Sequence, residues 1–520
     1  MVKKVMLLGL VIGLMLGGLM PAVVLAQGGG EITLVPFESE AFGLQGVVPE
    51  GWKLAAPGVY QRQAAPGDLT SLIQQAAPGI SVEQLAASLL PRLGLTELPE
   101  PAGTLETAAF SWTLYSIDVT AGAINVHVDM ALATTDEGVV LVLLQSPPDE
   151  ADALAEAVFM PAVEALAPLA PAPVEDLPYR AEEVQFENPA AEGVTLAGTL
   201  TLPQGAGPHP AVILISGSGP SDRDESILPL AEIKPFALIA DYLTRQGIAV
   251  LRYDDRGVGD STGEHETATS ADLASDVEAA IAYLLSREDI NPAQIGLLGH
   301  SEGGVIAPMV AARNPNVAFV ISLAGSAVPG YDVLVRQNER LLATAGVSEE
   351  EIAARVAWVR TLMDAMLAED WAQVEGLLRE DYARAIADLP AEQRDALGDV
   401  EAYIDEQIAA AMPLYRYWMP YFLAHDPAED WRQVTVPVLA FFGGLDVQVD
   451  ADQNRPALEA ALAEAGNDDV TVITIENANH LFQPAETGSV EEYGALPQEF
   501  VPELLPTIAD WLLERVTLAE

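Results

Sequence analysis

The chain contains no cysteine among its 520 residues, so its fold depends on a packed core and not on disulfides. Lysine and arginine are scarce, at 24 against 77 aspartates and glutamates, which gives a formal net charge of -53 at pH 7. That balance argues against binding to nucleic acid or to anionic membrane surfaces. The acidic residues are scattered along the chain, and we therefore interpret them as solvated helix surfaces that favour solubility.

Long apolar runs are nearly absent as well, apart from one at the start of the chain. Residues 5–25 are uncharged and apolar and follow Lys3 and Lys4, and Val24-Leu25-Ala26 before Gln27 resembles a small-residue cleavage site. This pattern is typical of a secretory signal peptide over residues 1–26 and predicts an exported protein. The run is long for a signal peptide, so an uncleaved N-terminal membrane anchor is the alternative. Oligomeric state is not indicated by any pattern in the sequence.

The first part of the mature chain, residues 30–167, predicts a small α+β domain. Residues 124–132 alternate between apolar and polar side chains, as a half-buried strand does, and residues 149–166 have helical spacing. His127 stands alone on the polar face of that strand, and we interpret it as an ordinary surface histidine. Four prolines within residues 168–178 then predict a semi-stiff linker.

After the linker, short apolar runs alternate with helical patterns, which predicts a mostly parallel sheet covered on both faces. The expected core covers residues 179–327 and 427–520. The intervening residues 328–426 lose the strand signal, and Ser348 with Glu351 forms a capping-box pattern there. We expect this segment to be a helical cap inserted into the sheet domain. The expected strands cover 194–202, 211–216, 247–253, 294–299, 437–444 and 470–478, and the expected helices cover 235–246, 270–286 and 500–516.

A serine lies between glycines where one of these buried strands ends. Gly299-His300-Ser301-Glu302-Gly303 fits the G-x-S-x-G pattern, with an apolar run before it and an apolar helix after it. A sharp strand-to-helix turn would project the Ser301 hydroxyl from the sheet, and bulky neighbours would clash at such a turn. The pattern therefore predicts a nucleophile, although a simple tight turn would also accommodate these residues.

A serine hydroxyl needs a base to take its proton, and an acid must orient that base. On this kind of sheet the order along the chain is serine, acid, histidine, and only His425 and His480 follow Ser301. His425 ends the helical insertion, whereas His480 follows an apolar strand at the carboxyl edge of the sheet. We therefore predict His480 as the base.

The acid is expected in the loop after the strand at 437–444. Asp446 follows two glycines there and is the predicted partner of His480. Two further acids lie deeper in the same loop, where solvation or helix capping explains them better, namely Asp450 and Asp452.

An oxyanion intermediate needs N–H donors that are already in place. We expect them to be the backbone N–H of Glu302, directly after the nucleophile, and that of Ser218 in the glycine-rich loop ISGSGP. The Glu302 side chain would pair with Arg223 or Arg256 or cap the following helix. The charged residues 222–224 are expected to brace the same loop by ion pairs.

Other chemistry has weaker support in the sequence. The segment DDRGVGDSTG, residues 254–263, lacks the Lys-Ser/Thr of a P-loop and is better read as a structural turn beside the site. No group of His and carboxylate residues has metal-ligand spacing, so no metal is predicted. The aromatic stretch at 414–422 fits either packing between cap and sheet or the lining of a substrate pocket.

These residues together resemble the α/β-hydrolase family, and more closely bacterial carboxylesterases grouped with serine-aminopeptidase-like and dienelactone-hydrolase-like sequences. The resemblance covers about residues 179–516 and is carried by GSGPSDRDE, YDDRGVGDSTG, GHSEGG, FFGGLDVQVDADQN and NANHLFQPAETG. It implies an eight-stranded α/β-hydrolase sheet with a helical cap, hydrolysis of short-chain carboxylic esters, and no cofactor. It also implies the triad Ser301, Asp446 and His480.

The expected function is therefore that of an exported serine esterase acting on a small-molecule ester. A serine peptidase of the aminopeptidase or dipeptidyl type is the enzymatic alternative, because the acid-rich cap could hold a substrate ammonium. A non-catalytic binding protein on a hydrolase scaffold is the third possibility, and the ordered Ser, Asp and His argue against it.

Overall fold

The structure, a computed structural model, describes residues 32–39, 42–62, 68–78, 80–82, 84–85, 98–121, 124–135, 138–169, 177–227, 230–388, 394 and 399–519. The predicted signal segment 1–26 lies outside this part of the chain, as does most of the predicted linker. The residues group into two compact units. One comprises Met1–Val174, Leu228–Glu232 and Ala383–Ile404, and the other comprises Glu175–Ile227, Ile233–Tyr382 and Asp405–Glu520. Within the described ranges, each helix is too short or too polar to cross a bilayer.

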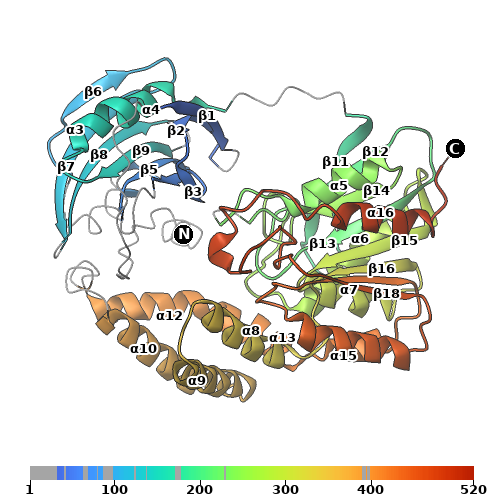
Figure 1. Cartoon of the computed structure of the whole chain (residues 1–520). Coiled ribbons are helices and arrows are strands. Elements are labelled where there is room, and N and C mark those ends of the chain that lie inside the picture. The colour runs from blue at the N-terminus through green and yellow to red at the C-terminus, as the bar shows by residue number, and fades with distance from the viewer. Residues whose placement is uncertain are drawn as a thin grey trace. The chain divides into compact units, whose positions relative to one another are not determined.

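The first unit contains two antiparallel sheets (Figure 1). The larger has the strand order β3-β4-β5-β9-β8-β7-β6, and the smaller has the order β1-β2-β10. The bounds are Leu34–Ser39 (β1), Leu44–Pro49 (β2), Lys53–Ala56 (β3), Val59–Gln61 (β4), Ser71–Pro78 (β5), Gly103–Glu106 (β6), Ser111–Ala121 (β7), Ile124–Thr134 (β8), Gly138–Ser146 (β9) and Ala167–Pro168 (β10). The strand predicted at 124–132 is thus present as β8.

Both faces of the larger sheet are covered. On β9, Val140, Val142 and Leu144 enter one apolar core, while the alternating residues Val139, Leu141 and Leu143 enter the other. The period of two along a strand explains why β9 is apolar almost throughout. The helix predicted near 149–166 covers one face in three consecutive pieces, Ala151–Leu154 (α3), Ala155–Phe159 (η2) and Met160–Ala165 (α4).

His127 lies on the partly exposed face of β8. Its Nδ1 lies 2.8 Å from Asp118 Oδ1, and its Nε2 lies 3.0 Å from Ser116 Oγ, so it links β8 to β7. Burial lowers the pKa of His127, but the carboxylates of Asp118 and Asp129 together raise it above its ordinary value.

The second unit contains the predicted eight-stranded, mostly parallel sheet, in the order β11-β12-β14-β13-β15-β16-β17-β18. β12 pairs antiparallel with β11 and β14, and all the pairings from β14 to β18 are parallel. The bounds are Tyr179–Glu187 (β11), Thr195–Pro203 (β12), His209–Ile215 (β13), Ala249–Tyr253 (β14), Ile290–His300 (β15), Val317–Leu323 (β16), Val438–Gly443 (β17) and Val470–Ile475 (β18). The sequence patterns did not single out β11 or β16.

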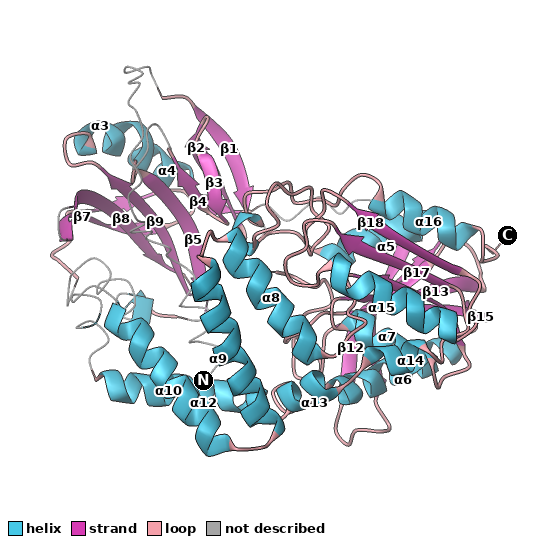
Figure 2. Cartoon of the chain, turned by 60° about the horizontal axis from the view of Figure 1, so that its bottom comes forward, coloured by secondary structure: helices cyan, strands magenta, loops and turns pink. Residues whose placement is uncertain are grey.

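Helices cover both faces of this sheet, as its nearly continuous apolar strands require. Figure 2 shows α5 and α16 on one face and α6, α7, α14 and α15 on the other. The bounds are Pro235–Arg245 (α5), Ser270–Leu285 (α6), Gly303–Ala311 (α7), Pro427–Trp431 (α14), Ala451–Glu464 (α15) and Leu504–Leu513 (α16). On the face covered by α6, α7, α14 and α15, a large apolar core joins the sheet to these four helices.

The helical insertion is present between β16 and β17. Its helices are Gly330–Thr344 (α8), Glu349–Leu367 (α9), Trp371–Asp388 (α10), Val400–Arg416 (α12) and Trp418–Ala424 (α13). The predicted capping box begins α9, where Ser348 and Glu351 bond reciprocally to each other's backbone N–H. α13 packs against α8 and α9 and also contacts α6 beneath the cap.

Candidate active site

The predicted site residues all follow carboxyl ends of parallel strands. Ser218 follows β13, Ser301 follows β15, Asp446 follows β17, and His480 follows β18. Because these strands run in the same direction, their carboxyl ends lie at one edge of the sheet. Segments that are far apart in the sequence are therefore brought together at that edge.

Ser301 occupies a strained turn. Its φ is 52°, in the left-handed region that serine rarely adopts, and its N–H donates to the carbonyl of Leu323 at 2.8 Å. A Cβ at Gly299 would lie 2.0 Å from Gly303 O, and one at Gly303 would lie 2.1 Å from Ile215 O. Only glycine fits at either position, so the flanking glycines make this tight strand-to-helix turn possible.

Asp446 and His480 are joined directly. His480 Nδ1–H donates to Asp446 Oδ2 at 2.8 Å, and the two side chains are buried, with 7% and 0% of their surface exposed. Asp446 Oδ1 accepts from the N–H groups of Gln448 and Val449 at 2.7 and 2.9 Å. The carboxylate is therefore fixed by backbone donors, and it holds the imidazole with Nε2 available for another proton.

The alternative residues for the base and the acid, His425 and Asp450, have contacts outside the Asp446–His480 pair. His425 is the residue that ends α13, and its ring stacks on Tyr421. Asp450 begins α15, where it accepts from the N–H of Asp452, and it also pairs with Arg336 at 2.5 Å. Among the described residues, no hydrogen bond joins the Ser301 hydroxyl to the His480 ring. Such bonds are often long before substrate binds.

The two expected oxyanion donors lie beside the Ser301 turn. The N–H groups of Ser218 and Glu302 have no hydrogen-bond acceptor within the described part of the chain, whereas the neighbouring Gly217 N–H is occupied by Glu225. Glu302 also directly precedes α7, whose N-terminus favours negative charge nearby. Both N–H groups are therefore available to an anionic oxygen.

The Glu302 side chain does not pair with an arginine and does not cap α7, so those interpretations were wrong. It accepts from Ser270 Oγ at 2.5 Å and from the Trp418 indole N–H at 2.8 Å. Burial raises the pKa of this carboxyl, and the nearby polar groups of Ser270, Trp418 and Ser218 partly offset that effect. Because Trp418 belongs to the cap, Glu302 connects the cap to the nucleophile turn.

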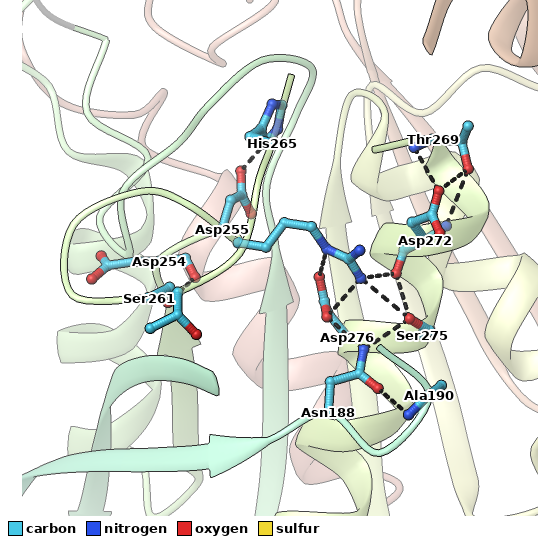
Figure 3. Close-up of polar contacts among 12 residues, drawn as sticks. Asn188, Ala190, Asp254, Asp255, Ser261, His265, Thr269, Asp272, Ser275 and Asp276 are labelled. Carbon is cyan, nitrogen blue, oxygen red and sulfur yellow. Dashed lines mark hydrogen bonds and ion pairs between the residues drawn. The ribbon is translucent and has the colours of Figure 1, made fainter. Parts of the chain in front are cut away.

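The loop that carries Ser218 is braced by the turn at 254–263. Asp255 accepts from Ser216 Oγ at 2.8 Å and from the N–H of Ser221 at 3.0 Å. Burial raises the pKa of Asp255 to about 8 against the effect of these two donors. His265 Nε2 lies 3.9 Å from the same carboxyl (Figure 3). The structural interpretation of this turn is therefore supported by its contacts.

Two arginines, of which Arg256 is buried, hold the same turn. Arg256 forms two bonds to the Asp276 carboxylate, at 2.7 and 2.9 Å, and Asn188 donates to that carboxylate at 2.7 Å (Figure 3). Arg223 binds Asp254 in the same way, at 3.1 and 2.7 Å. The expected ion-pair bracing by residues 222–224 is thus present for Arg223.

Sequence reasoning missed two polar residues behind the site. His300 precedes the serine, and Glu225 has a φ of 53° in the loop after β13, and the two side chains are paired at 2.9 Å. The chain order serine, acid, histidine points only to histidines that follow Ser301, so it assigns no role to His300, which precedes the serine. Within the described ranges, no group of three or more His, Cys, Asp and Glu side chains could hold a metal ion.

Comparison with known proteins agrees with this architecture. Residues 232–486 match the family model described as "Serine aminopeptidase, S33". This match, together with the sheet and its cap, defines the second unit as an α/β hydrolase.

Three of the individual proteins that this chain resembles share at most 30% sequence identity with it over the aligned residues. The chain is 28% identical to esterase EstD of Thermotoga maritima over 339 residues, covering 65% of this chain and 70% of that one. It is 30% identical over 148 residues to polyketide transferase claH of Penicillium crustosum, covering 27% of this chain and 43% of that one. The solved Pyrococcus furiosus esterase Pf2001 aligns with 14% identity and a TM-score of 0.40, covering 67% of this chain and 96% of that one.

Proposed function

We propose that this protein is an exported serine hydrolase that cleaves carboxylic esters with short acyl chains. The observation that carries the proposal is the buried 2.8 Å bond from His480 to Asp446, on the same sheet edge as the Ser301 turn. Similarity to esterase EstD supports an ester as the substrate. The signal-like residues 1–26 support export.

In the first half of the reaction, the Ser301 oxygen attacks the acyl carbon while His480 Nε2 takes the hydroxyl proton. Asp446 keeps Nδ1 protonated and stabilises the resulting imidazolium. The N–H groups of Ser218 and Glu302 receive the oxyanion of the tetrahedral intermediate. His480 then gives its proton to the leaving alkoxide as the bond between acyl carbon and alcohol oxygen breaks.

In the second half, water replaces the alcohol. His480 takes a proton from the water while the water oxygen attacks the acyl carbon. The N–H groups of Ser218 and Glu302 then hold the second oxyanion. The bond to the Ser301 oxygen breaks, and the proton passes from His480 to that oxygen. The carboxylic acid leaves, and the enzyme returns to its starting state.

Parallel assays test the substrate class. We expect the purified protein to hydrolyse nitrophenyl acetate and butyrate faster than longer esters and to leave aminoacyl anilides intact. The Ser301→Ala variant should lose at least about 1000-fold in kcat, because the nucleophile is removed. Turnover of anilides without turnover of esters would instead establish the peptidase, which the family description makes the main alternative.

A further inference from the structure

Both ring nitrogens of His300 have hydrogen-bond partners behind the nucleophile turn. Nε2–H donates to the backbone carbonyl of His480 at 3.0 Å, because a carbonyl oxygen can only accept. Nδ1 lies 2.9 Å from Glu225 Oε1, which already accepts the N–H of Gly217 at 2.8 Å. A neutral imidazole carries only one N–H, so this arrangement requires a further proton between His300 and Glu225.

That further proton belongs on the histidine. Imidazole is the stronger base, with an ordinary pKa of about 6.5 against about 4.3 for a glutamate carboxyl. Burial lowers the pKa of His300, but Glu225, the His480 carbonyl and the Asp446 carboxylate together raise it above its ordinary value. The His480 imidazole also lies beside the ring, with ring centroids 4.9 Å apart. His300 is thus an imidazolium paired with a carboxylate, and both side chains are buried.

This ion pair joins three segments of the site. Glu225 holds Gly217, the neighbour of Ser218. His300 belongs to the nucleophile turn. The carbonyl that accepts from its ring belongs to His480 itself. The segments are also in close contact, since a Cβ at Gly217 would lie 3.2 Å from Ser301 Cβ. Movement of the imidazolium would therefore change the distance from Ser301 to both the base and the oxyanion donor.

We propose that His300, held in its charged form by Glu225, is a positioning residue that sets the geometry between Ser301 and His480. It does not touch the substrate and does not exchange a proton with it. The inference rests on the proposed function, because it concerns how that site is assembled. It makes the active geometry depend on a proton that is lost as the pH rises through the pKa of His300.

The protonation state can be measured without any substrate. In protein labelled with ¹⁵N at histidine, we expect a ring signal with two protonated nitrogens at pH 7.5 that is absent from the His300→Gln spectrum. In Glu225→Gln the same ring should lose its second proton at least about one pH unit lower, because the carboxylate that stabilises it is gone. A His300 ring that is neutral at pH 7.5 in the native protein would overturn the inference.

Kinetics test the positioning role. His300→Gln keeps an amide N–H for the His480 carbonyl but, like neutral His300, offers Glu225 no donor, so we expect a kcat about fivefold below the native plateau and independent of the pH at which His300 titrates. His300→Leu lacks this donor and should lose about 10–100-fold in kcat with little change in KM, the cost expected of a small displacement between reacting groups. The control is His209→Gln. It changes a buried histidine at the start of β13, whereas the Ser218 loop follows the other end of that strand.

The pH profile separates the possible outcomes. Native kcat should fall on the alkaline side at the pH where the His300 signal titrates, and His300→Gln should lack that limb. Asp255 contacts the Ser218 loop and also titrates, so it could cause an alkaline limb of its own. A fall in kcat at a pH other than that of the His300 signal therefore contradicts the assignment of the limb to His300. Equal kcat in the Gln and Leu variants also contradicts it. A native protein that hydrolyses no ester refutes the proposed function instead, and the NMR result still decides whether the charged pair exists.

Discussion

The Trp418 indole N–H gives the most detailed prediction about the cap. In Trp418→Phe the bond of 2.8 Å to Glu302 Oε1 is lost, but an aromatic ring remains to stack on Phe422, now 4.6 Å away with an interplanar angle of 13°. Trp358→Phe is the matched control. Trp358 is also a half-buried cap tryptophan, and its Nε1 has no partner among the described residues.

The magnitude follows from the environment of Glu302. A hydrogen bond to a charged group contributes about 1.5–3 kcal/mol. Glu302 is buried but keeps the bond from Ser270 Oγ at 2.5 Å, which favours the lower end of that range. The two Trp→Phe changes remove the same atoms from half-buried side chains. We therefore expect Trp418→Phe to reduce the free energy of unfolding by about 1.5 kcal/mol more than Trp358→Phe.

The assay is urea unfolding followed by fluorescence and by residual esterase activity, which reports on the second unit. A double-mutant cycle with Glu302→Met then isolates the pair, because the loss of ring volume cancels in the coupling energy. The expected coupling is also about 1.5 kcal/mol. Equal stability losses in the two Trp→Phe variants, with a coupling below about 0.3 kcal/mol, would refute the contact between cap and nucleophile turn.

Two other buried acids yield predictions. The pKa of Asp255 is raised in the folded state to about 8, so the folded protein keeps a proton on Asp255 that the unfolded chain loses near pH 4. The contribution of Asp255 to the free energy of unfolding therefore falls as the pH rises from about 4 to 8. Urea unfolding of Asp255→Asn should show a smaller loss over that range, and the same pH dependence as in the native protein would contradict this. Arg256→Met leaves the buried Asp276 without its cation and should cost about 3–5 kcal/mol, and a loss below about 1 kcal/mol would show that the ion pair contributes little.

Much of the site could be predicted because its signals are local or follow chain order. The glycines around Ser301 reflect a turn in which any Cβ would clash, and that constraint is readable from five residues. Asp446 and His480 follow buried strands, and parallel pairing brings the ends of those strands together without further information. The same alternation of strands and helices predicted the sheet and the inserted cap.

The remaining features depend on contacts between distant residues. Glu302 and Trp418 are 116 positions apart, and His300 and Glu225 are 75 apart, so no local pattern indicates either pair. A buried carboxylate also looks the same in sequence as a solvated one, especially in a chain with 77 acidic residues. The edge strand β11 was missed because only Val184 and Phe186 are buried in it, and its three glutamates interrupt the apolar pattern.

The central claim is that Ser301 is a nucleophile activated by His480 and Asp446. The most direct measurement is peptide mass mapping of the full chain after reaction with a fluorophosphonate, combined with the rate constant of that reaction. We predict one adduct, on Ser301, and a rate constant lowered at least about 1000-fold in His480→Ala. An adduct on another residue, or an unchanged rate constant in His480→Ala, would contradict the account.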